Sequence, residues 1–311
     1  MRISAIIKKL RRLASVMSDF PERFEDLQQS VARIELRQLE GNKSLKLQDH
    51  EFKAFSQNGE DGILQFLIQQ IPIKNKVFVE FGVHDYMESN TRFLLKHNNW
   101  SGLVIDGDPK NIEHIKSDQL FWRHRLHADC SFVTRENINA IITRNGIAGD
   151  IGLLSVDIDG NDYWVWEAIN CINPCVVVCE YNGLFGPSAK LSTRYAPDFL
   201  YSKAHYSTLF CGASLAAFHH LGMNKGYSLV GSNTGGNNAF LVRDDVLGSL
   251  KGLTPQEAYV PYSFRTSRDR KGNLTFLNFD ECVELIADLV LVDVSTGEET
   301  TLRKSNAILT R

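Results

Sequence analysis

Short apolar segments that each end in an acidic residue recur along the middle of this chain and constrain its fold strongly. They lie between Lys76 and Asn182 and end at Glu80, Asp106, Asp129, Asp157 and Glu180. Each run is rich in Val, Ile, Leu and Phe and lacks the polar alternation of a half-exposed strand. This pattern is typical of strands that helices bury on both faces, so it predicts a parallel sheet.

The segments between and after these strands complete the predicted architecture. Helical patterns follow each strand, and a helix with Glu60 and Asp61 in its first turn leads into the first strand. The last two apolar segments are separated by only a short turn at 233–238, so they must pair antiparallel. We therefore predict an α/β fold: a doubly wound, mostly parallel, Rossmann-like sheet with a C-terminal antiparallel hairpin, preceded by an N-terminal helical arm.

The acidic residues at the strand ends predict a polar ligand site. The carboxyl ends of parallel strands meet at one edge of a sheet, and ligands of open α/β sheets bind in the crevice beyond that edge. The five acidic side chains should therefore converge on one cleft.

Length and charge limit the domain organisation and the class of ligand. The chain has 311 residues, is 43% hydrophobic and carries a formal net charge of -3. We predict an N-terminal arm at 1–50, one catalytic-size domain at 51–250 and a C-terminal extension at 251–311 without an assigned role. The absence of a basic stripe in the sequence argues against a nucleic-acid partner.

Cysteine usage and hydropathy indicate a cytoplasmic protein. The six cysteines are scattered, several of them inside apolar runs, where a reduced cysteine packs as a small hydrophobic residue. The sequence contains no apolar run long enough for a bilayer span or a signal peptide.

The N-terminal arm carries two helical patterns. Residues 1–15 include five basic residues and no acidic one, with apolar residues at helical spacing. This segment is an expected site of peripheral contact with the inner face of the membrane, with a solvated or partner-binding helix as the alternative. After Pro21, Phe24, Leu27, Val31 and Ile34 follow a heptad spacing that predicts a coiled coil and a homo-oligomer. The helix should end near Leu39.

Ordered motifs over residues 52–245 resemble the S-adenosylmethionine (SAM)-dependent class I methyltransferases of the FkbM-like type and their metal-dependent sugar O-methyltransferase relatives. The first motif, VEFGVHDYMESNT, resembles the family's acid-x-Gly turn through Glu80 and Gly82, although a later glycine of many members is missing. SQNGED, which contains Gln57, resembles the family's S-Q-x-G-E-D signature.

The resemblance implies SAM as the cofactor, held by Gln57, Glu80, Gly82, Asp106 and Asp129. In this reading Asp106 accepts hydrogen bonds from the ribose hydroxyls and Asp129 binds the adenine amino group. A glycine suits the turn because the backbone must approach the ligand there. Alternatively, Asp129 caps a turn. Asp108, two residues after Asp106, is expected to cap the helix that starts at Pro109.

The segment SVDIDG, together with the later CEYN, resembles the stretches with which metal-dependent sugar methyltransferases hold magnesium. The resemblance implies Asp157, Asp159 and Glu180 as ligands of Mg²⁺, although Cys179 replaces the first acid of the usual downstream pair. Without a metal, Asp157, Asp159 or His84 would accept the acceptor's proton.

The resulting prediction is a SAM-dependent enzyme that O-methylates a sugar hydroxyl in a polysaccharide or glycoconjugate. The segment 184–199 is expected to form a substrate lid, and the turn at 233–238 is expected to place Asn237 or Asn238 near the acceptor. Two alternatives stay open. A metal-dependent glycosyltransferase could use a D-x-D triplet at 106–108 or 157–159, and a non-catalytic scaffold could keep the fold with a degenerate cleft.

Overall fold

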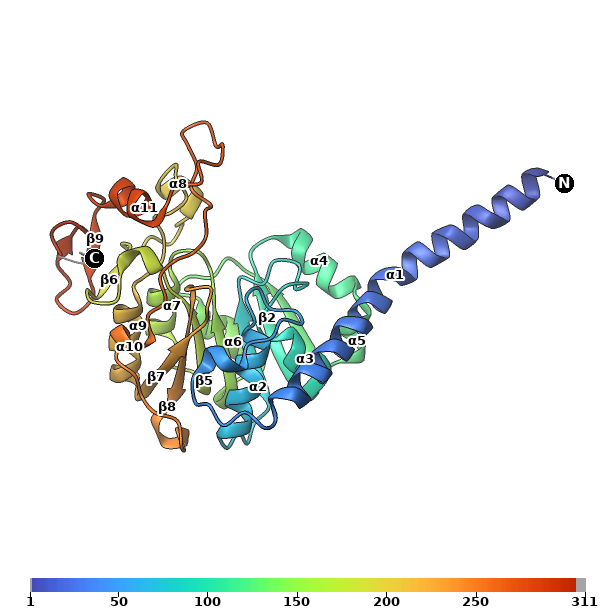
Figure 1. The fold of residues 1–311 in the computed structure, drawn as a ribbon, viewed down its shortest axis with the longest axis horizontal. Coiled ribbons are helices and arrows are strands. Elements are labelled where there is room, and N and C mark those ends of the chain that lie inside the picture. The colour runs from blue at the N-terminus through green and yellow to red at the C-terminus, as the bar shows by residue number, and fades with distance from the viewer. Residues whose placement is uncertain (1, 306–311) are drawn as a thin grey trace.

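The computed structural model describes the backbone of residues 2–305 and the side chains of Lys9, Phe20 and residues 22–305. A twisted sheet with helices on both faces forms the body of the molecule, and helix α1 projects from one side of it (Figure 1). The predicted α/β class with an N-terminal helical arm is confirmed.

The central sheet has seven strands in the order β3-β2-β1-β4-β5-β8-β7. The first five strands of the chain run parallel, whereas β8 is antiparallel to both β5 and β7, as the short turn between β7 and β8 predicted. The strands are β1 (Val77–Phe81), β2 (Ser101–Asp106), β3 (Leu126–Cys130), β4 (Gly149–Val156), β5 (Ile172–Glu180), β7 (Tyr227–Ser232) and β8 (Asn238–Arg243).

The strand order reverses direction at β1, which pairs with β2 on one side and with β4 on the other. Successive βα units wind outward from this point in opposite directions. The loops that follow β1 and β4 therefore diverge and leave a crevice at the carboxyl edge of the sheet, where open α/β sheets bind their ligands.

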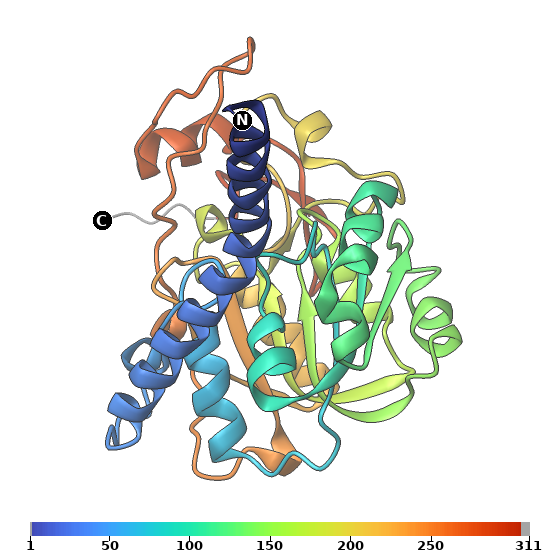
Figure 2. The ribbon, with the colours of Figure 1, turned by 90° about the vertical axis from the view of Figure 1, so that its right-hand side faces the viewer.

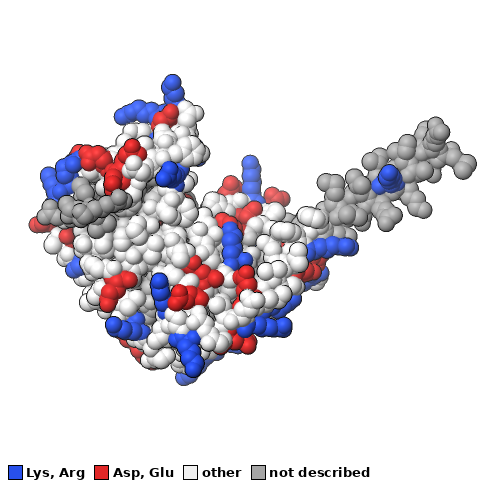
Figure 3. Space-filling view, in the orientation of Figure 1, with Lys and Arg blue, Asp and Glu red and all other residues white. Residues whose placement is uncertain are grey.

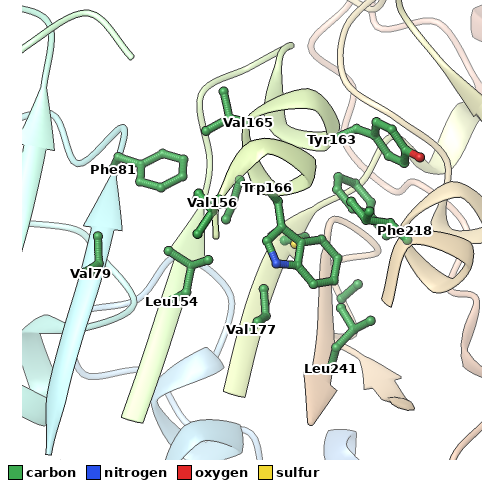
Figure 4. Close-up of a cluster of buried hydrophobic side chains, with 14 of the residues drawn as sticks. Val79, Phe81, Leu154, Val156, Tyr163, Val165, Trp166, Val177, Phe218 and Leu241 are labelled. Atoms are coloured by element: carbon green, nitrogen blue, oxygen red, sulfur yellow. The ribbon is translucent and has the colours of Figure 1, made fainter. Parts of the chain in front are cut away.

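Alternating strand residues build one hydrophobic core on each face of the sheet. Val79, Leu154 and Val177 pack against Trp166 and Phe218 on one face (Figure 4). Their strand neighbours point to the opposite face, which α2, α3 and α4 cover. The helices of the body are α2 (Glu60–Gln70), α3 (Arg92–Asn98), α4 (Pro109–Ser117), α5 (Gln119–Arg123), α6 (Ile138–Arg144), α7 (Asp162–Ala168), α8 (Tyr201–Ala204) and α9 (Leu215–Lys225).

Residues beyond 250 form a smaller unit beside the segment that follows β5. A three-stranded sheet in the order β10-β9-β6 joins the two parts of the chain, and a third hydrophobic cluster lies next to it. No sequence pattern predicted this pairing, because its strands have only two or three residues. The elements are β6 (Leu191–Ser192), α10 (Pro255–Ala258), α11 (Phe279–Ile286), β9 (Leu291–Asp293) and β10 (Glu299–Thr300), with short 3-10 helices at Leu47–His50, Gly183–Phe185 and Asp244–Val246. The predicted domain boundaries stay a prediction.

Helix α1 (Arg2–Leu39) ends where the sequence predicted and passes through Pro21 without a break. Near its C-terminal end, Ala32 is buried in a cluster with Phe52, Phe55 and Phe93. The N-terminal part of the helix extends beyond the body of the molecule in Figure 1 and points toward the viewer in Figure 2. The predicted membrane contact through the side chains of 1–15 lies, apart from Lys9, outside the described residues.

The surface carries both charge signs. On the described part of the face in Figure 3, acidic and basic side chains are interspersed. Among the described residues, no helix combines the length and the apolar character that a membrane crossing requires.

Candidate functional site

Two adjoining clefts open at the carboxyl edge of the sheet. The first cleft, of about 550 Å³, lies over the ends of β1, β2 and β4. The second cleft, of about 690 Å³, lies between the end of β5, the β7–β8 turn and the C-terminal unit. Three residues line both clefts: His84, Asp159 and Tyr201. The two clefts therefore meet at these residues.

Gly82 forms the turn after β1 and lines the first cleft. Its φ is +81°, and a Cβ atom at this position would lie 1.5 Å from the backbone oxygen of Asp157. Only glycine fits, because the turn adopts a left-handed conformation and touches the backbone that follows β4. The lack of a Cβ at Gly82 is thus required by the Asp157 backbone, and the predicted contact of Gly82 with the cofactor stays a prediction.

Asp106 ends β2 and organises the floor of the first cleft. Its Oδ2 accepts a hydrogen bond from the His84 backbone N–H at 2.8 Å. Its Oδ1 accepts bonds from the Asp108 backbone N–H at 2.8 Å and from the Asn111 side chain at 3.0 Å. A carboxylate has about four lone-pair positions, so Asp106 keeps acceptor capacity toward the cleft. Asp108 caps α4 by accepting a hydrogen bond from the Lys110 backbone N–H, in the capping role that the sequence predicted for it.

Glu80 lines neither cleft, so the expected convergence of the five acids on one cleft does not include it, and its predicted role in cofactor binding stays a prediction. The side chain is buried, and it accepts hydrogen bonds from the backbone N–H groups of Asn90 at 2.8 Å and Thr91 at 3.1 Å. Burial raises the pKa of this carboxyl, and the hydrogen bonds partly offset that shift. Glu80 thus fixes the loop that leads into α3. The acid-x-Gly pattern identified the turn but not the partner of the acid.

Asp129 also lies outside the linings of both clefts, and its predicted contact with adenine stays a prediction. Its carboxylate pairs with the Arg144 guanidinium at 2.5 Å and accepts from Asn145 at 2.7 Å and Ser131 at 2.7 Å. Although partial burial acts to raise the pKa of Asp129, these hydrogen bonds outweigh it and lower the pKa to about 2. Asp129 thus ties the end of β3 to the C-terminal end of α6.

The residues just after β3 line the first cleft in place of Asp129. Phe132 is half exposed and stands beside Gly107, with Ser131 and Val133 next to it. Sequence reasoning missed Phe132. The available signal was an aromatic residue in a polar loop directly after a strand end.

Asp157, Asp159 and Glu180 come together at the junction of the clefts, as the sequence predicted. Each offers one oxygen, and these oxygens lie within 4.8 Å of one another. Asp157 follows β4 and Glu180 ends the neighbouring strand β5, so the sheet itself brings them together. Asp159 has a left-handed φ of 55°. Its loop is held by Asp162, whose carboxylate accepts from the backbone N–H groups of Ile158 at 2.7 Å and Gly160 at 2.8 Å.

The environment of this acid cluster favours bound protons or a bound cation. Burial and then the repulsion of Asp159 raise the pKa of Asp157, and burial and then Asp157 raise the pKa of Glu180. Burial also raises the pKa of Asp159, whereas His84 acts to lower it. Hard oxygen ligands from neighbouring strand ends are a donor set suited to Mg²⁺.

The β7–β8 turn is anchored to the N-terminal end of α2. The buried Glu60 carboxylate accepts from the side-chain amides of Asn233 at 2.6 Å and Asn238 at 2.8 Å. The Asn237 side-chain amide donates a hydrogen bond to Gln57 Oε1 at 3.4 Å. Both residues line the second cleft. They thus stand at the second cleft and not at the first, and the predicted contacts of Gln57 with the cofactor and of Asn237 with the acceptor stay predictions.

The segment after β5 covers part of the site. Phe199 packs on Gly160, where a Cβ atom would lie 2.2 Å from the Phe199 ring. The Asn161 side chain donates to the Ala196 carbonyl at 2.8 Å, which ties this segment to the Asp159 loop. Tyr201, just beyond the segment predicted as a lid, lines both clefts and was not identified from the sequence.

Comparison with known proteins gives structural neighbours only. No family model and no curated protein matches the chain. The SAH-bound N-terminal domain of EvdMO1 matches with a TM-score of 0.39 and 12% identity, over 70% of this chain and 94% of that chain. The CurJ carbon methyltransferase matches with a TM-score of 0.39 and 9% identity, over 65% and 57% of the two chains. The plantazolicin methyltransferase BamL matches with a TM-score of 0.33 and 14% identity, over 64% and 70%. Likeness at this level assigns no activity.

Proposed function

We propose that this protein is a SAM-dependent methyltransferase that methylates a hydroxyl group of a sugar, in a polysaccharide or glycoconjugate, with help from a divalent cation. One observation carries the proposal: the acid cluster stands where two clefts meet. The first cleft offers a carboxylate at a strand end for a cofactor, and the second offers polar and aromatic walls for an acceptor. The strand order with its antiparallel β8 is the class I methyltransferase layout.

The first cleft fits a nucleoside cofactor. Asp106 has acceptor capacity left for ribose hydroxyls, and Asn111 stands beside it. Phe132 offers an exposed ring on which a purine can stack. Gly82 leaves the backbone of the turn open toward the ligand. When bound, SAM supplies a methyl group on a positively charged sulfur.

The acid cluster fits the handling of the acceptor's proton. An alcohol must lose its proton as its oxygen becomes a methyl ether, and a nearby carboxylate can take that proton. Asp159 lines both clefts and is therefore the side chain best placed for this role, with His84 as its neighbour. A cation held by Asp157, Asp159 and Glu180 would lower the pKa of a coordinated hydroxyl.

The second cleft fits a ligand rich in hydroxyl groups. Its walls combine the side-chain amides of Gln57 and Asn237 with the rings of Tyr206 and Tyr262. Amides donate and accept hydrogen bonds, and aromatic faces pack against the apolar face of a sugar ring. The assignment of a sugar rests on this combination and on the family resemblance of the sequence.

A nucleotide-sugar-dependent glycosyltransferase is the rival activity. In the D-x-D triplet at 106–108, Asp108 caps α4, whereas Asp106 keeps acceptor capacity toward the first cleft. The triplet at 157–159 keeps this alternative open. A non-catalytic scaffold remains the other alternative.

Calorimetric titration with S-adenosylhomocysteine (SAH), with and without Mg²⁺, tests the proposal. We expect micromolar binding to the wild type, loss of binding in Asp106→Ala and unchanged binding in Glu113→Gln, which alters an exposed carboxylate on α4. Absence of SAH binding in both conditions would overturn the methyltransferase assignment. Binding of a nucleoside diphosphate sugar instead would favour the glycosyltransferase.

Mass spectrometry of the product tests the reaction class. Incubation with SAM and a panel of polysaccharides and glycoconjugates should add 14 Da to an acceptor, and NMR of the product should place the methyl group on oxygen. A methyl group on carbon or nitrogen would overturn the choice of a hydroxyl while leaving SAM binding intact.

A further inference from the structure

We infer that helix α1 pairs with α1 of a second copy of this chain in a parallel coiled coil. A stripe of apolar side chains on α1 lies open to solvent in the single chain. The exposed fractions are 63% for Phe20, 51% for Phe24, 59% for Leu27, 46% for Val31 and 54% for Ile34. A row of this kind indicates a surface that a partner covers.

The opposite face of α1 contacts the globular body and thereby holds the apolar stripe toward solvent. Ala32 is buried against the body, and Glu25 pairs with the buried guanidinium of Arg92 at 2.6 Å and also with Lys96. Because these contacts already use the inner face of α1, rotation of the helix cannot bury the stripe against its own domain. The apolar surface must find its contacts outside the chain.

The spacing of the stripe is that of a heptad seam. The five residues follow each other at intervals of four and three and occupy alternating d and a positions. The sequence continues the same register toward the N-terminus without a polar interruption. It places Ile3, Leu10 and Met17 at a and Ile6 and Leu13 at d, so ten successive a and d positions are apolar. The next a position is Gln38, close to the end of the helix.

The length of the seam separates this pattern from a chance alignment. The described stripe from Phe20 to Ile34 covers only two heptads, which is weak evidence for a coiled coil. The register from Ile3 to Ile34 extends beyond the three to four heptads that indicate one. At about 1.5 Å per residue, this seam is about 48 Å long. The helix is continuous over its whole length.

A second copy fits this seam better than a membrane surface does. A helix that lies on a bilayer needs a broad apolar face, whereas a coiled coil needs only the narrow a and d seam. Beside the described seam stand Arg23, Gln28, Ser30 and Glu35. Identical a and d side chains form matching knobs and holes, so the seam is self-complementary.

The flanking charges favour the parallel orientation. Basic residues occupy four g positions, Arg2, Lys9, Arg23 and Arg37, whereas no e position is basic. Antiparallel helices set g against g and would oppose basic residues. Parallel helices set g against e and avoid this repulsion.

Light scattering of the full chain tests the pairing. The wild type should have a mass of about 70 kDa, twice the 35.1 kDa of one chain. The Leu27→Glu, Val31→Glu double variant should be monomeric, whereas Arg33→Glu, which places a charge at an exposed c position, should keep the mass of the wild type. Both substituted side chains face solvent, so circular dichroism should give the same Tm for the globular body. A second variant lacks residues 1–19 and leaves the globular body intact. It should have the mass of a single shortened chain, whereas the wild type has the mass of two chains.

Two further readouts decide the occupant and the orientation. Under oxidation, Val31→Cys should form a linked dimer that the wild type does not form, because equal a positions meet only in parallel helices. A monomeric wild type that floats with phosphatidylserine vesicles, and loses this binding in the double variant, would overturn the pairing in favour of a membrane surface. A dimer without the Val31 cross-link would overturn the parallel orientation.

Discussion

The carboxylate of Asp106 accepts the backbone N–H of His84 at 2.8 Å, so the end of β2 holds the turn after β1 in place. His84 has a left-handed φ of 49°, which costs a non-glycine residue about 1–2 kcal/mol. The hydrogen bond that the His84 N–H donates to Asp106 offsets part of this cost. The same carboxylate thus shapes the turn and faces the first cleft, where a ligand would meet a preformed acceptor.

Asp106→Asn should disturb both roles. The amide NH₂ would meet the donors of His84, Asp108 or Asn111, which leaves one of them unpaired at a cost of about 1–3 kcal/mol. SAH affinity should fall at least about tenfold, the equivalent of about 1.4 kcal/mol. Urea unfolding and calorimetry measure the two effects. The matched control is Thr254→Ala, which removes the N-cap of α10, away from the first cleft, at a cost of about 1 kcal/mol and should leave SAH affinity unchanged.

Gly82→Ala should be more damaging than Gly146→Ala. Both glycines have a left-handed φ, +81° and +77°, so both substitutions incur a backbone cost of about 1–2 kcal/mol. Only at Gly82 does the new Cβ also meet backbone, at 1.5 Å from the Asp157 oxygen. Overpacking of this kind adds about 1–3 kcal/mol.

The comparison of the two alanine variants isolates the contact between the β1 turn and the Asp157 backbone. Differential scanning calorimetry should show a lower Tm for Gly82→Ala, and only this variant should weaken SAH binding. Equal Tm values would mean that the turn can shift away from Asp157 at no cost.

The fold could be predicted because its signals are local and strong. Apolar runs without alternation specify buried strands, and the short turn at 233–238 requires an antiparallel pair. The acid cluster was also predictable, since Asp157 and Glu180 end neighbouring parallel strands. Strand ends place a residue at the correct edge of the sheet. They do not tell whether its side chain turns to the cleft or to a neighbouring loop.

Glu80 and Asp129 demonstrate that limit. Both acids stand at the carboxyl edge as predicted, but Glu80 holds the backbone of Asn90 and Thr91, and Asp129 pairs with Arg144. Their partners lie 10 to 15 residues further along the chain, in loops and helices whose approach depends on packing. Phe132 and Tyr201 were missed for the converse reason, because a loop residue and the first residue of the four-residue helix α8 reach the clefts without any periodic pattern.

Asp129→Asn should lower stability and spare the cofactor site. The ion pair with Arg144 holds the folded-state pKa of Asp129 near 2, below the unfolded value of 3.8. A depressed pKa contributes stability above the unfolded value and loses it as the pH falls toward the folded value. Because the Arg144 side chain is 53% exposed, solvent screens the pair, and we expect a loss of about 1 kcal/mol at neutral pH.

The pH dependence of the stability loss in Asp129→Asn tests whether the ion pair with Arg144 causes it. In urea unfolding, the difference from the wild type should shrink as the pH is lowered from about 4 toward 2, where Asp129 becomes protonated. High salt should also reduce it. SAH affinity should stay at the wild-type value. A loss of SAH binding in Asp129→Asn would return this residue to the adenine contact that the sequence predicted.

Mg²⁺ should stabilise the wild type through the acid cluster. Three carboxylates with oxygens within 4.8 Å of one another repel each other when ionised, and a divalent cation relieves this repulsion. A ligand at a concentration 100 times its Kd stabilises the folded state by about 2.7 kcal/mol, so Tm should rise with added Mg²⁺ and fall after chelation. Glu180→Gln removes one ligand charge and should abolish most of the response. Glu113→Gln changes an exposed carboxylate on α4 and should keep the full response. An equal rise of Tm in both variants would assign the effect of Mg²⁺ to general ionic screening and leave the acid cluster to proton transfer alone.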